Sequence, residues 1–510
     1  MRATAPSLDL PLTRMRAVER VHAPSARGWL ALFFFGAVAL RAAYLAFGTS
    51  DTTFVGWYID GFHHWQIAYL TKEIGLSHGL RLWDLGGVEY FWGFVPTIVD
   101  AAALTLTSST AMWPLQLVNV IAGSLSVAIL YLIGRRYWSH AAGIALAVFF
   151  AVNPVSVLTD ASAMQEPIAF LFLSLALLWF VDRPGRAGLM LGLAAASRPD
   201  YWVYSLAIIG CGGVALGALN QKPPFVRLDR IGSLLTGYLF VIVPFVLYLW
   251  IQTGNPVYPL YWNFLGNAQG QWSPPVDPTS RQLQAQLFAR GLLAIALIGL
   301  PLVMLRKPSG WPVWITALLG AGLIGYMLGI SRYVVQYLDR FWLDRIMLLL
   351  YLLVAAAFAV VISRLVSQMS RGRGLATAVL ILPLLALNAA WPLVFSYQDA
   401  VRGYEADAAF GARVAAVATE GTVVVPGDAV VVTYNLVQNG VHADRLLSGL
   451  YHPDYAPGAS DELFRWLRTY NVRWLAVHGN DTFYGPLIAN EPAHFQLVMK
   501  GVLDLYRVTP

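Results

Sequence analysis

The sequence predicts a mainly α-helical protein, built as a polytopic transmembrane helix bundle and followed by a small C-terminal α/β domain. The first observation is composition: the 510 residues are 57% hydrophobic and only 12% charged, whereas about a quarter of the residues in a soluble domain are charged. The second is pattern. Apolar runs close to the roughly 20 residues that a helix needs to cross a bilayer recur between positions 29 and 395 and then stop.

The apolar runs give about 11 transmembrane spans. The first follows a basic cytoplasmic segment, residues 1–28, and no small-residue cleavage site comes after it, so we expect a retained helix. We place the spans at residues 29–47, 112–134, 141–158, 167–181, 187–199, 201–219, 231–251, 287–305, 311–330, 345–363 and 375–395.

Basic residues between the spans predict the topology. With a cytoplasmic N-terminus, every inside loop is basic, as the positive-inside rule requires, so the net charge of +6 needs no nucleic-acid partner. The stretch 92–107, WGFVPTIVDAAALTLT, would invert all later loops if it crossed the membrane. Because it is short and contains Pro96 and Asp100, we expect an interfacial or re-entrant helix there.

These assignments give three regions: the segment 1–28, a transmembrane domain at 29–395 with a large first outer loop at 48–111, and an extracytoplasmic α/β domain at 396–510. In the last region, TVVVPGDAVVVTY alternates like a strand, SDELFRWLRTYNVRWLAV predicts a helix and then a strand, and FQLVMKGVLDLYRV predicts a closing hairpin. Cys211 is the only cysteine, which excludes an intramolecular disulfide.

Carboxylates at the outer ends of the spans are the first candidate site residues, because ionisable groups near membrane depth are costly and often functional. Asp60 and Glu89 lie in the first outer loop, Glu166 begins a span, and Asp200 ends the short run 187–199. Other interpretations stay open. Asp60 could be a turn residue in IDG, and Glu166 beside Pro167 could stabilise the start of its helix.

The first outer loop also contains YIDGFHHWQIAYLTKEI, with adjacent histidines and a tryptophan. His63 or His64, together with Glu89, could hold a divalent metal ion, although nothing in the spacing requires a metal. Adjacent helical residues point in different directions, so only one histidine should face a given site. Trp65 could stack on a sugar, or it could belong to an interfacial aromatic belt. We also assign Tyr201, after Asp200, to substrate binding.

Arginines on the predicted outer face form a third group of candidates. The stretch SRYVVQYLDRFWLDR contains Arg332, Arg340 and Arg345, and Arg198 lies in ASRPDYW. Guanidinium groups bind phosphate through two parallel hydrogen bonds. The alternative is local pairing, as between Arg340 and Asp344. An anionic lipid headgroup or a lipid-linked phosphate is the simplest ligand.

The order of these features resembles the GT-C superfamily of membrane glycosyltransferases, especially bacterial relatives of protein O-mannosyltransferases and lipid A aminoarabinose transferases. The resemblance rests on six stretches in order, before the C-terminal α/β region: LRAAYL, DGFHHWQIAYLTKEIGLSHG, RRYW, NPVSVLTDASAMQEP, GLMLGLAAASRPD and DRFWLDRIMLLLYLLVAAAFA. DGFHHW also resembles the outer-loop signature of oligosaccharyltransferase catalytic subunits.

The resemblance implies an inverting glycosyl transfer from a polyprenyl-phosphate sugar to a hydroxyl of a lipid, glycan or protein acceptor at the outer face of the membrane. By this resemblance, Asp60 is the catalytic base, Glu166 is a second catalytic carboxylate, and Arg340 binds the donor phosphate. The family often has a second acid beside the base, where this chain has Gly61. No cofactor beyond a divalent metal ion is implied.

Three other classes remain as alternatives. An oligosaccharyltransferase-like ligase for lipid-linked oligosaccharides shares most of these features. A lipid or sugar transporter would explain the helices, but the chain lacks paired repeats and has a large outer loop. A structural scaffold would leave Glu166 and the outer arginines unexplained. A cytoplasmic nucleotide-sugar donor is disfavoured, because the chain has no glycine-rich phosphate loop or dinucleotide fingerprint.

Overall fold

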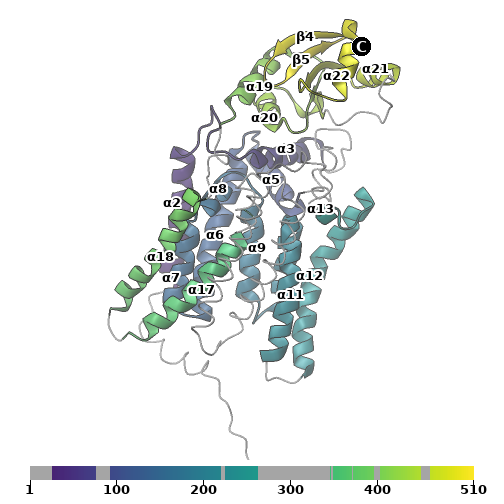
Figure 1. Ribbon diagram of the computed structural model, residues 1–510. Helices are drawn as coiled ribbons and strands as arrows, with labels where there is room; N and C mark the ends of the chain where they lie inside the picture. Colours follow the sequence, from purple (N-terminus) through teal and green to yellow (C-terminus); the bar gives the residue numbers. More distant parts are fainter. Residues whose placement is uncertain are drawn as a thin grey trace, which may run out of the picture.

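A bundle of apolar helices makes up the N-terminal part of the computed structural model, with a sheet above one end (Figure 1). The structure describes residues 26–75, 92–219, 224–261, 345, 348–369, 372–394, 403–448 and 460–509. The helices of the bundle are α2 (Ala26–Phe47), α5 (Phe94–Thr107), α6 (Trp113–Tyr137), α7 (His140–Ala151), α8 (Pro154–Ala161), α9 (Glu166–Trp179), α10 (Pro184–Ser197), α11 (Pro199–Leu219), α12 (Pro224–Thr253), α17 (Leu348–Ser367) and α18 (Arg373–Val394), with the short α13 (Tyr258–Tyr261).

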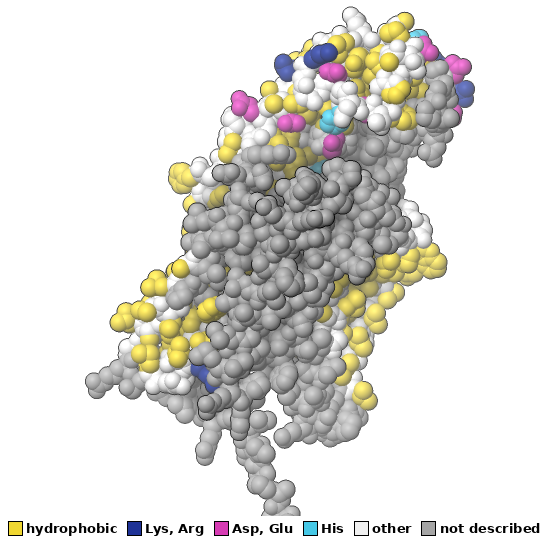
Figure 2. Space-filling model, in the orientation of Figure 1, with side chains coloured by type: hydrophobic (Ala, Val, Ile, Leu, Met, Phe, Trp, Pro, Cys, Tyr) yellow, Lys and Arg dark blue, Asp and Glu magenta, His cyan; other side chains and the backbone are white. Residues whose placement is uncertain are grey.

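The long helices have the length and composition of membrane spans. In the described part of the chain, Arg27–Phe47, Trp113–Tyr137 and Leu228–Thr253 are long and apolar enough to cross a bilayer. Their outer faces carry large apolar side chains such as Phe35, Phe240 and Ile251, which are 66%, 72% and 79% exposed. Figure 2 shows hydrophobic side chains on both sides of the bundle, whereas charged side chains gather on the C-terminal part. Such faces are stable when lipid covers them.

The bundle differs from the predicted spans at one place. The span predicted at 141–158 was wrong as a single helix: α7 and α8 are bent by 58° at a break between them. Pro154 cannot donate a backbone hydrogen bond, and the Asn153 side chain accepts one from the Ser156 amide and starts α8. The predicted spans 287–305 and 311–330 lie outside the described residues, so the count of about 11 spans stays a prediction.

The C-terminal region contains a five-stranded sheet in the order β2-β1-β3-β5-β4. β1, β2 and β3 run parallel, while β5 is antiparallel to β3 and β4. The predicted helix and strand at 460–477 and the hairpin at 495–508 are both confirmed. The elements are α19 (Glu405–Val417), β1 (Thr422–Val425), α20 (Val430–Gln438), η4 (Ala443–Arg445), β2 (Leu446–Ser448), α21 (Ser460–Thr469), β3 (Val472–Val477), α22 (Tyr484–Asn490), η5 (Pro492–His494), β4 (Phe495–Lys500) and β5 (Asp504–Val508).

The strand predicted over TVVVPGDAVVVTY was wrong in its second half. β1 ends at Val425, and the second valine run lies in the helix α20. Tertiary packing explains the difference, because it overrides the strand preference of β-branched residues. Val430, Tyr434 and Val437 have helical spacing and are all buried, in the same core as α3.

The helix α3 (Ile59–Ile74) joins the two parts of the chain. Alternate residues of β1 contribute to different cores: Val423 and Val425 belong with α20 and α3, whereas Val424 belongs with α21. One face of the sheet therefore packs, through α20, onto the first outer loop. Figure 1 shows α3 lying across the end of the bundle beneath the C-terminal region.

Candidate active site

Gly61 sets the position of Asp60. Both residues lie in the first turn of α3, so Asp60 is helical and not part of the turn suggested by IDG. Gly61 is buried against the segment between α8 and α9, where a side-chain carbon would collide with the carbonyl oxygen of Ser162. This close approach, possible only for glycine, brings Asp60 next to the start of α9.

Glu166 is the first residue of α9 and is 1% exposed. Its side chain does not cap its own helix. Instead, Glu166 Oε1 lies 2.5 Å from Arg198 Nη1 and 3.3 Å from Arg345 Nε. The helix N-terminus still favours its negative charge. Of the two interpretations left open by the sequence, the geometry therefore gives the side chain an ion-pairing role with both arginines.

The predicted acids and arginines form a continuous chain of ion pairs. Asp60 Oδ2 lies 2.7 Å from Arg345 Nη1, and Arg198 Nε lies 2.8 Å from Asp200 Oδ1. With the two contacts to Glu166, the order is Asp60, Arg345, Glu166, Arg198, Asp200. Three carboxylates thus share two guanidinium groups in a largely buried cluster. The second oxygen of Glu166, Oε2, is buried and has no hydrogen-bond partner among the described residues.

Three of the predicted site residues, Glu89, Arg332 and Arg340, lie outside the described residues. Arg345 is fully buried, and its guanidinium lies 4.8 Å from the ring centre of Tyr58. Tyr58 immediately precedes α3, so its ring and Asp60 hold this arginine from the same segment. The electrons of an aromatic face attract a cation, and the attraction is larger when water is excluded.

Burial and the charge of Arg345 are main causes of the shifted pKa values of the ionisable residues in α3. Burial raises the pKa of the Asp60 carboxyl, but Arg345 and the two histidines outweigh this effect and bring the pKa below its ordinary value. Burial lowers the pKa of His64 to about 3, against the attraction of Asp60. The pKa of His63 is also lowered by burial, although Asp60 and Asp428 oppose the shift. Both histidines are therefore neutral, and Asp60 is ionised, at neutral pH.

The two histidines have different surroundings. The centre of the His64 ring lies 4.8 Å from that of the Trp92 ring, and the charges of Arg345 and Arg198 help to lower the pKa of His64. Asp428 of the C-terminal region acts on His63 instead and opposes the lowering of its pKa. His64 Nδ1 and Nε2 are buried without hydrogen-bond partners in the described part of the chain. Within that part, no group of three or more histidine, cysteine or acidic residues is arranged to hold a metal ion.

Solved structures similar to this chain include those of two kinds of enzyme. ArnT, the lipid A aminoarabinose transferase of Cupriavidus metallidurans, is 12% identical in its apo state, with a TM-score of 0.56 over 95% of this chain and 98% of that one. The same protein bound to undecaprenyl phosphate is 13% identical, with a TM-score of 0.53 over 94% of this chain and 98% of that one. The Archaeoglobus fulgidus oligosaccharyltransferase AglB, in complex with an inhibitory peptide and a dolichol-phosphate, is 12% identical. Its TM-score is 0.53 over 90% of this chain and 71% of that one.

The chain has the GT-C fold. The likeness extends over nearly the whole chain and, for ArnT, nearly the whole of the other protein. No protein-family model and no curated protein matches the sequence.

Trp65 and Tyr201 do not belong to the ion-pair cluster. Trp65 is fully buried, stacked on Tyr69 and against Tyr434, and its Nε1 donates to the Thr110 carbonyl. The predicted stacking of Trp65 on a sugar was therefore wrong, because its ring fills the junction with the C-terminal region. Tyr201 is buried beside Tyr204 in α11, directly after Asp200.

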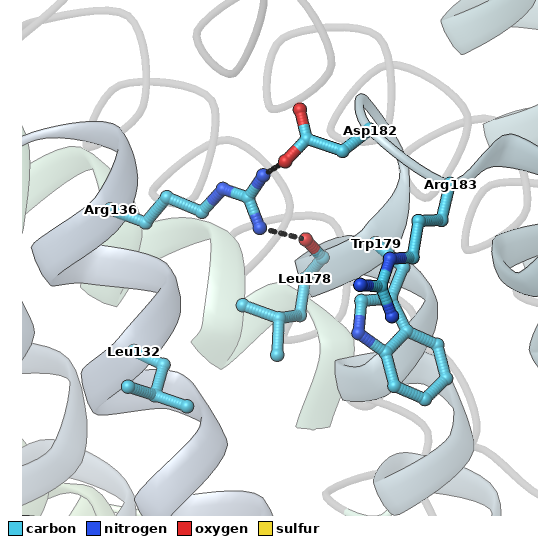
Figure 3. Close-up of a pocket in the computed structure, with 6 residues that line it drawn as sticks. All are labelled: Leu132, Arg136, Leu178, Trp179, Asp182 and Arg183. Atoms are coloured by element: carbon cyan, nitrogen blue, oxygen red, sulfur yellow. Dashed lines mark hydrogen bonds and ion pairs between the residues drawn. The ribbon is translucent and has the colours of Figure 1, made fainter.

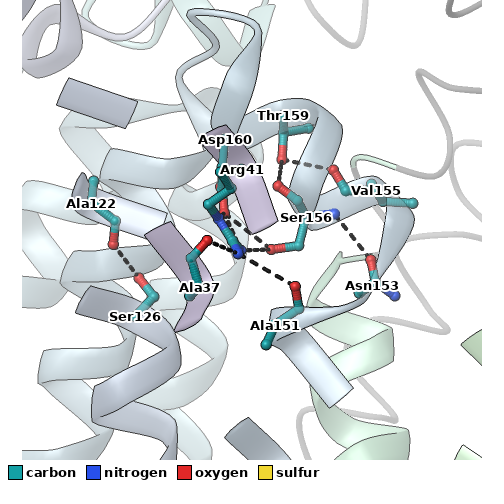
Figure 4. A network of polar contacts seen from close by, with 10 residues as sticks. All are labelled: Ala37, Arg41, Ala122, Ser126, Ala151, Asn153, Val155, Ser156, Thr159 and Asp160. Carbon is teal, nitrogen blue, oxygen red and sulfur yellow. Dashed lines mark hydrogen bonds and ion pairs between the residues drawn. The ribbon is translucent and has the colours of Figure 1, made fainter. Parts of the chain in front are cut away.

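A second buried network, centred on Arg41, supports the segment that leads to Glu166 (Figure 4). Arg41 of α2 contacts Asp160 of α8 at 2.6 Å, and also donates to Ser156 and to the Ala151 carbonyl. Arg41 was not among the site residues predicted from the sequence, although a charge inside an apolar helix indicates a buried partner. Gln165 likewise exchanges two hydrogen bonds with the backbone of Gly93, next to Glu166.

Proposed function

We propose that this protein is an integral-membrane inverting glycosyltransferase that transfers a sugar from a polyprenyl-phosphate donor to an acceptor hydroxyl. The observation that carries the proposal is the buried chain of three carboxylates and two arginines at the end of the bundle. The GT-C fold supports it, and the ArnT structure with undecaprenyl phosphate supports a lipid-linked donor. We place the site on the extracytoplasmic face, because the basic loops lie at the other ends of the helices.

Asp60 is the proposed base. The acceptor oxygen attacks the anomeric carbon of the sugar, its proton passes to the Asp60 carboxylate, and the bond between the anomeric carbon and the phosphate oxygen breaks. The electron pair of that bond stays on the phosphate, which gains a negative charge as it leaves. Arg345 and Arg198 stabilise this charge. Phosphate is a good leaving group, so the reaction needs no separate general acid.

Arg345 also couples donor binding to the base. In the free protein it pairs with Asp60 and Glu166. A donor phosphate that takes Arg345 as its partner leaves Asp60 buried without this counter-charge, which raises the pKa of its carboxyl and makes it a stronger base. Glu166 keeps its contact with Arg198 and holds that arginine in the site.

Transfer of a labelled sugar from a synthetic polyprenyl-phosphate monosaccharide, in proteoliposomes, tests the proposal. Asp60→Asn removes the proton acceptor, so we expect kcat to fall at least about 100-fold. Glu166→Gln should also lose activity, because Arg345 and Arg198 lose the carboxylate between them. Asp229→Asn makes the same chemical change at an exposed acid of α12 and should keep wild-type activity. Full activity in Asp60→Asn would exclude this residue as the base.

The alternative is an oligosaccharyltransferase-like ligase, which the similarity to AglB supports. Length favours the first proposal, because this chain covers 98% of ArnT but 71% of AglB. The two proposals differ in the donor. Consumption of a pyrophosphate-linked oligosaccharide, without consumption of the monosaccharide donor, would replace the first proposal with the ligase.

A further inference from the structure

A cavity of about 350 Å³ lies at the far end of the bundle from the ion-pair cluster, where α6 and α9 both end. Its lining is Leu132 and Arg136 of α6, Leu178 and Trp179 of α9, and Asp182 and Arg183 of the following loop. In Figure 3, Leu132 and Arg136 lie on one side, and Trp179 and Arg183 lie on the other. The 14 residues of α9 separate this cavity from Glu166 by about 20 Å.

One arginine of the cavity is held in place by protein groups. Arg136 forms an ion pair with Asp182, and its Nη1 donates to the Leu178 carbonyl at 3.1 Å. The Tyr137 hydroxyl lies 3.2 Å from the Leu177 and Leu178 carbonyls, which fastens the end of α6 to the end of α9. The wall that carries Arg136 is therefore preformed.

Arg183, opposite this wall, is exposed and has no ion-pair partner among the described residues. With Arg136 and Arg183 against Asp182 alone, the lining carries a net positive charge of one. A positively charged lining of this kind attracts an anion.

The cavity is also amphipathic. Leu132 lies one helical turn before Arg136, and Leu178 lies beside Trp179, so apolar and cationic side chains line the same space. Tryptophans concentrate where membrane spans meet water, and basic pockets between spans on the cytoplasmic side bind anionic lipid headgroups. The chemistry thus favours a ligand with a phosphate and an acyl chain over a purely water-soluble anion.

We propose that this cavity binds an anionic phospholipid of the surrounding bilayer. Arg183 and the fixed Arg136 contact the phosphate of the headgroup, and an acyl chain lies along Leu132 and Leu178. The bound lipid links the ends of α6 and α9 through a site separate from the proposed active site.

Native mass spectrometry of the full chain tests the proposal, with phosphatidylglycerol and phosphatidylcholine added separately. We expect phosphatidylglycerol to bind at least about tenfold more tightly, and Arg183→Gln to weaken this binding about tenfold, because a charge-assisted contact to phosphate is lost. Arg183 is exposed, so its replacement should leave the unfolding temperature of the lipid-free protein unchanged.

Two controls separate this site from general attraction to anionic lipid. Arg186→Gln removes an exposed charge of the same region that does not line the cavity, and it should bind phosphatidylglycerol like the wild type. Glycerol phosphate supplies the headgroup chemistry without acyl chains and should not displace the lipid at equal concentration. Equal affinity for both lipids, an equal loss in both variants, or displacement by glycerol phosphate would each overturn the proposal.

Discussion

At the scale of single residues, Arg345 determines how Asp60 can act. The guanidinium and the two histidines hold the pKa of the Asp60 carboxyl below its ordinary value, against the opposing effect of burial. Such a lowered pKa stabilises the folded state at neutral pH, and this contribution is lost as the pH falls through the folded-state pKa. An ionised Asp60 paired with arginine is a weak base until another anion takes the arginine.

This pairing predicts two different acid limbs in the pH dependence of activity. The profile of kcat/KM reports the free enzyme, so its acid limb should lie below the ordinary pKa of an aspartic acid, whereas the profile of kcat reports the complex with donor and should have its limb at higher pH. The base works only when deprotonated, so activity falls as the pH drops through each limb. Initial rates across pH at saturating and low donor concentrations measure both profiles.

If the acid limb of kcat lay at the same pH as that of kcat/KM, or at a lower pH, the donor phosphate would not be replacing Asp60 as the partner of Arg345. The histidines should add no limb near pH 6.5, because both of their pKa values are lowered and the pKa of His64 falls to about 3. Replacing His64 with glutamine removes one of the groups that lower the pKa of the Asp60 carboxyl, so the acid limb of kcat/KM should move to higher pH.

The identity of the acids and arginines could be predicted from the sequence, but their pairing could not. Glu166 and Arg198 were selected because each lies at the predicted outer end of an apolar run, and Asp60 because it lies in the first outer loop. Arg198 bonds to Glu166 across 32 positions, and Arg41 bonds to Asp160 across 119. A charge in an apolar segment indicates that a partner exists, whereas the identity of that partner depends on which helices pack together.

At the scale of elements, the approach of α3 to the segment before α9 decides where the proposed base, Asp60, lies. The enzymes that this sequence resembles often have a second acid beside their base, and the structure gives a reason for Gly61 in this chain: a side chain at that position would collide with the Ser162 carbonyl. In the sequence, Gly61 stood out only as the neighbour of Asp60 in IDG and as the position of the missing second acid. Its steric role depends on a contact about a hundred residues away, which no local pattern contains.

Gly61→Ala should therefore move the start of α3 away from α9 and displace Asp60 from Arg345. A shift of about 1 Å in a catalytic group can cost about 100-fold in rate, so we expect kcat to fall by this order with a smaller change in KM. Gly232→Ala is the matched control, because Gly232 lies in α12 with open space around it. Wild-type kcat in Gly61→Ala would show that α3 tolerates the extra carbon without moving Asp60.

At the scale of the whole molecule, the C-terminal region is fastened to the helix that carries the proposed base. Tyr434 of α20 contacts the rings of Trp65, Phe62 and Phe54, with ring centres 4.6, 5.4 and 5.8 Å apart. The helix, strands and hairpin of this region could largely be predicted from their periodicity. The packing of α20 on α3 could not be predicted, because a run of buried valines has the pattern of a strand and its packing partner is not visible in the sequence.

Tyr434→Ala should loosen this junction while leaving the sheet folded. Removing a buried aromatic ring costs about 3–5 kcal/mol, and here that cost falls on the contact between α20 and α3. Hydrogen exchange should show faster exchange in α3 and unchanged exchange in α21, which packs in the core on the other face of the sheet. Tyr434→Phe keeps the ring and loses only a 3.4 Å contact with the Met112 amide, so it should behave like the wild type. Equally faster exchange in α21 would mean that Tyr434 supports the sheet itself. If α3 alone loosens and kcat falls with it, the C-terminal region holds Asp60 in place from outside the helix bundle.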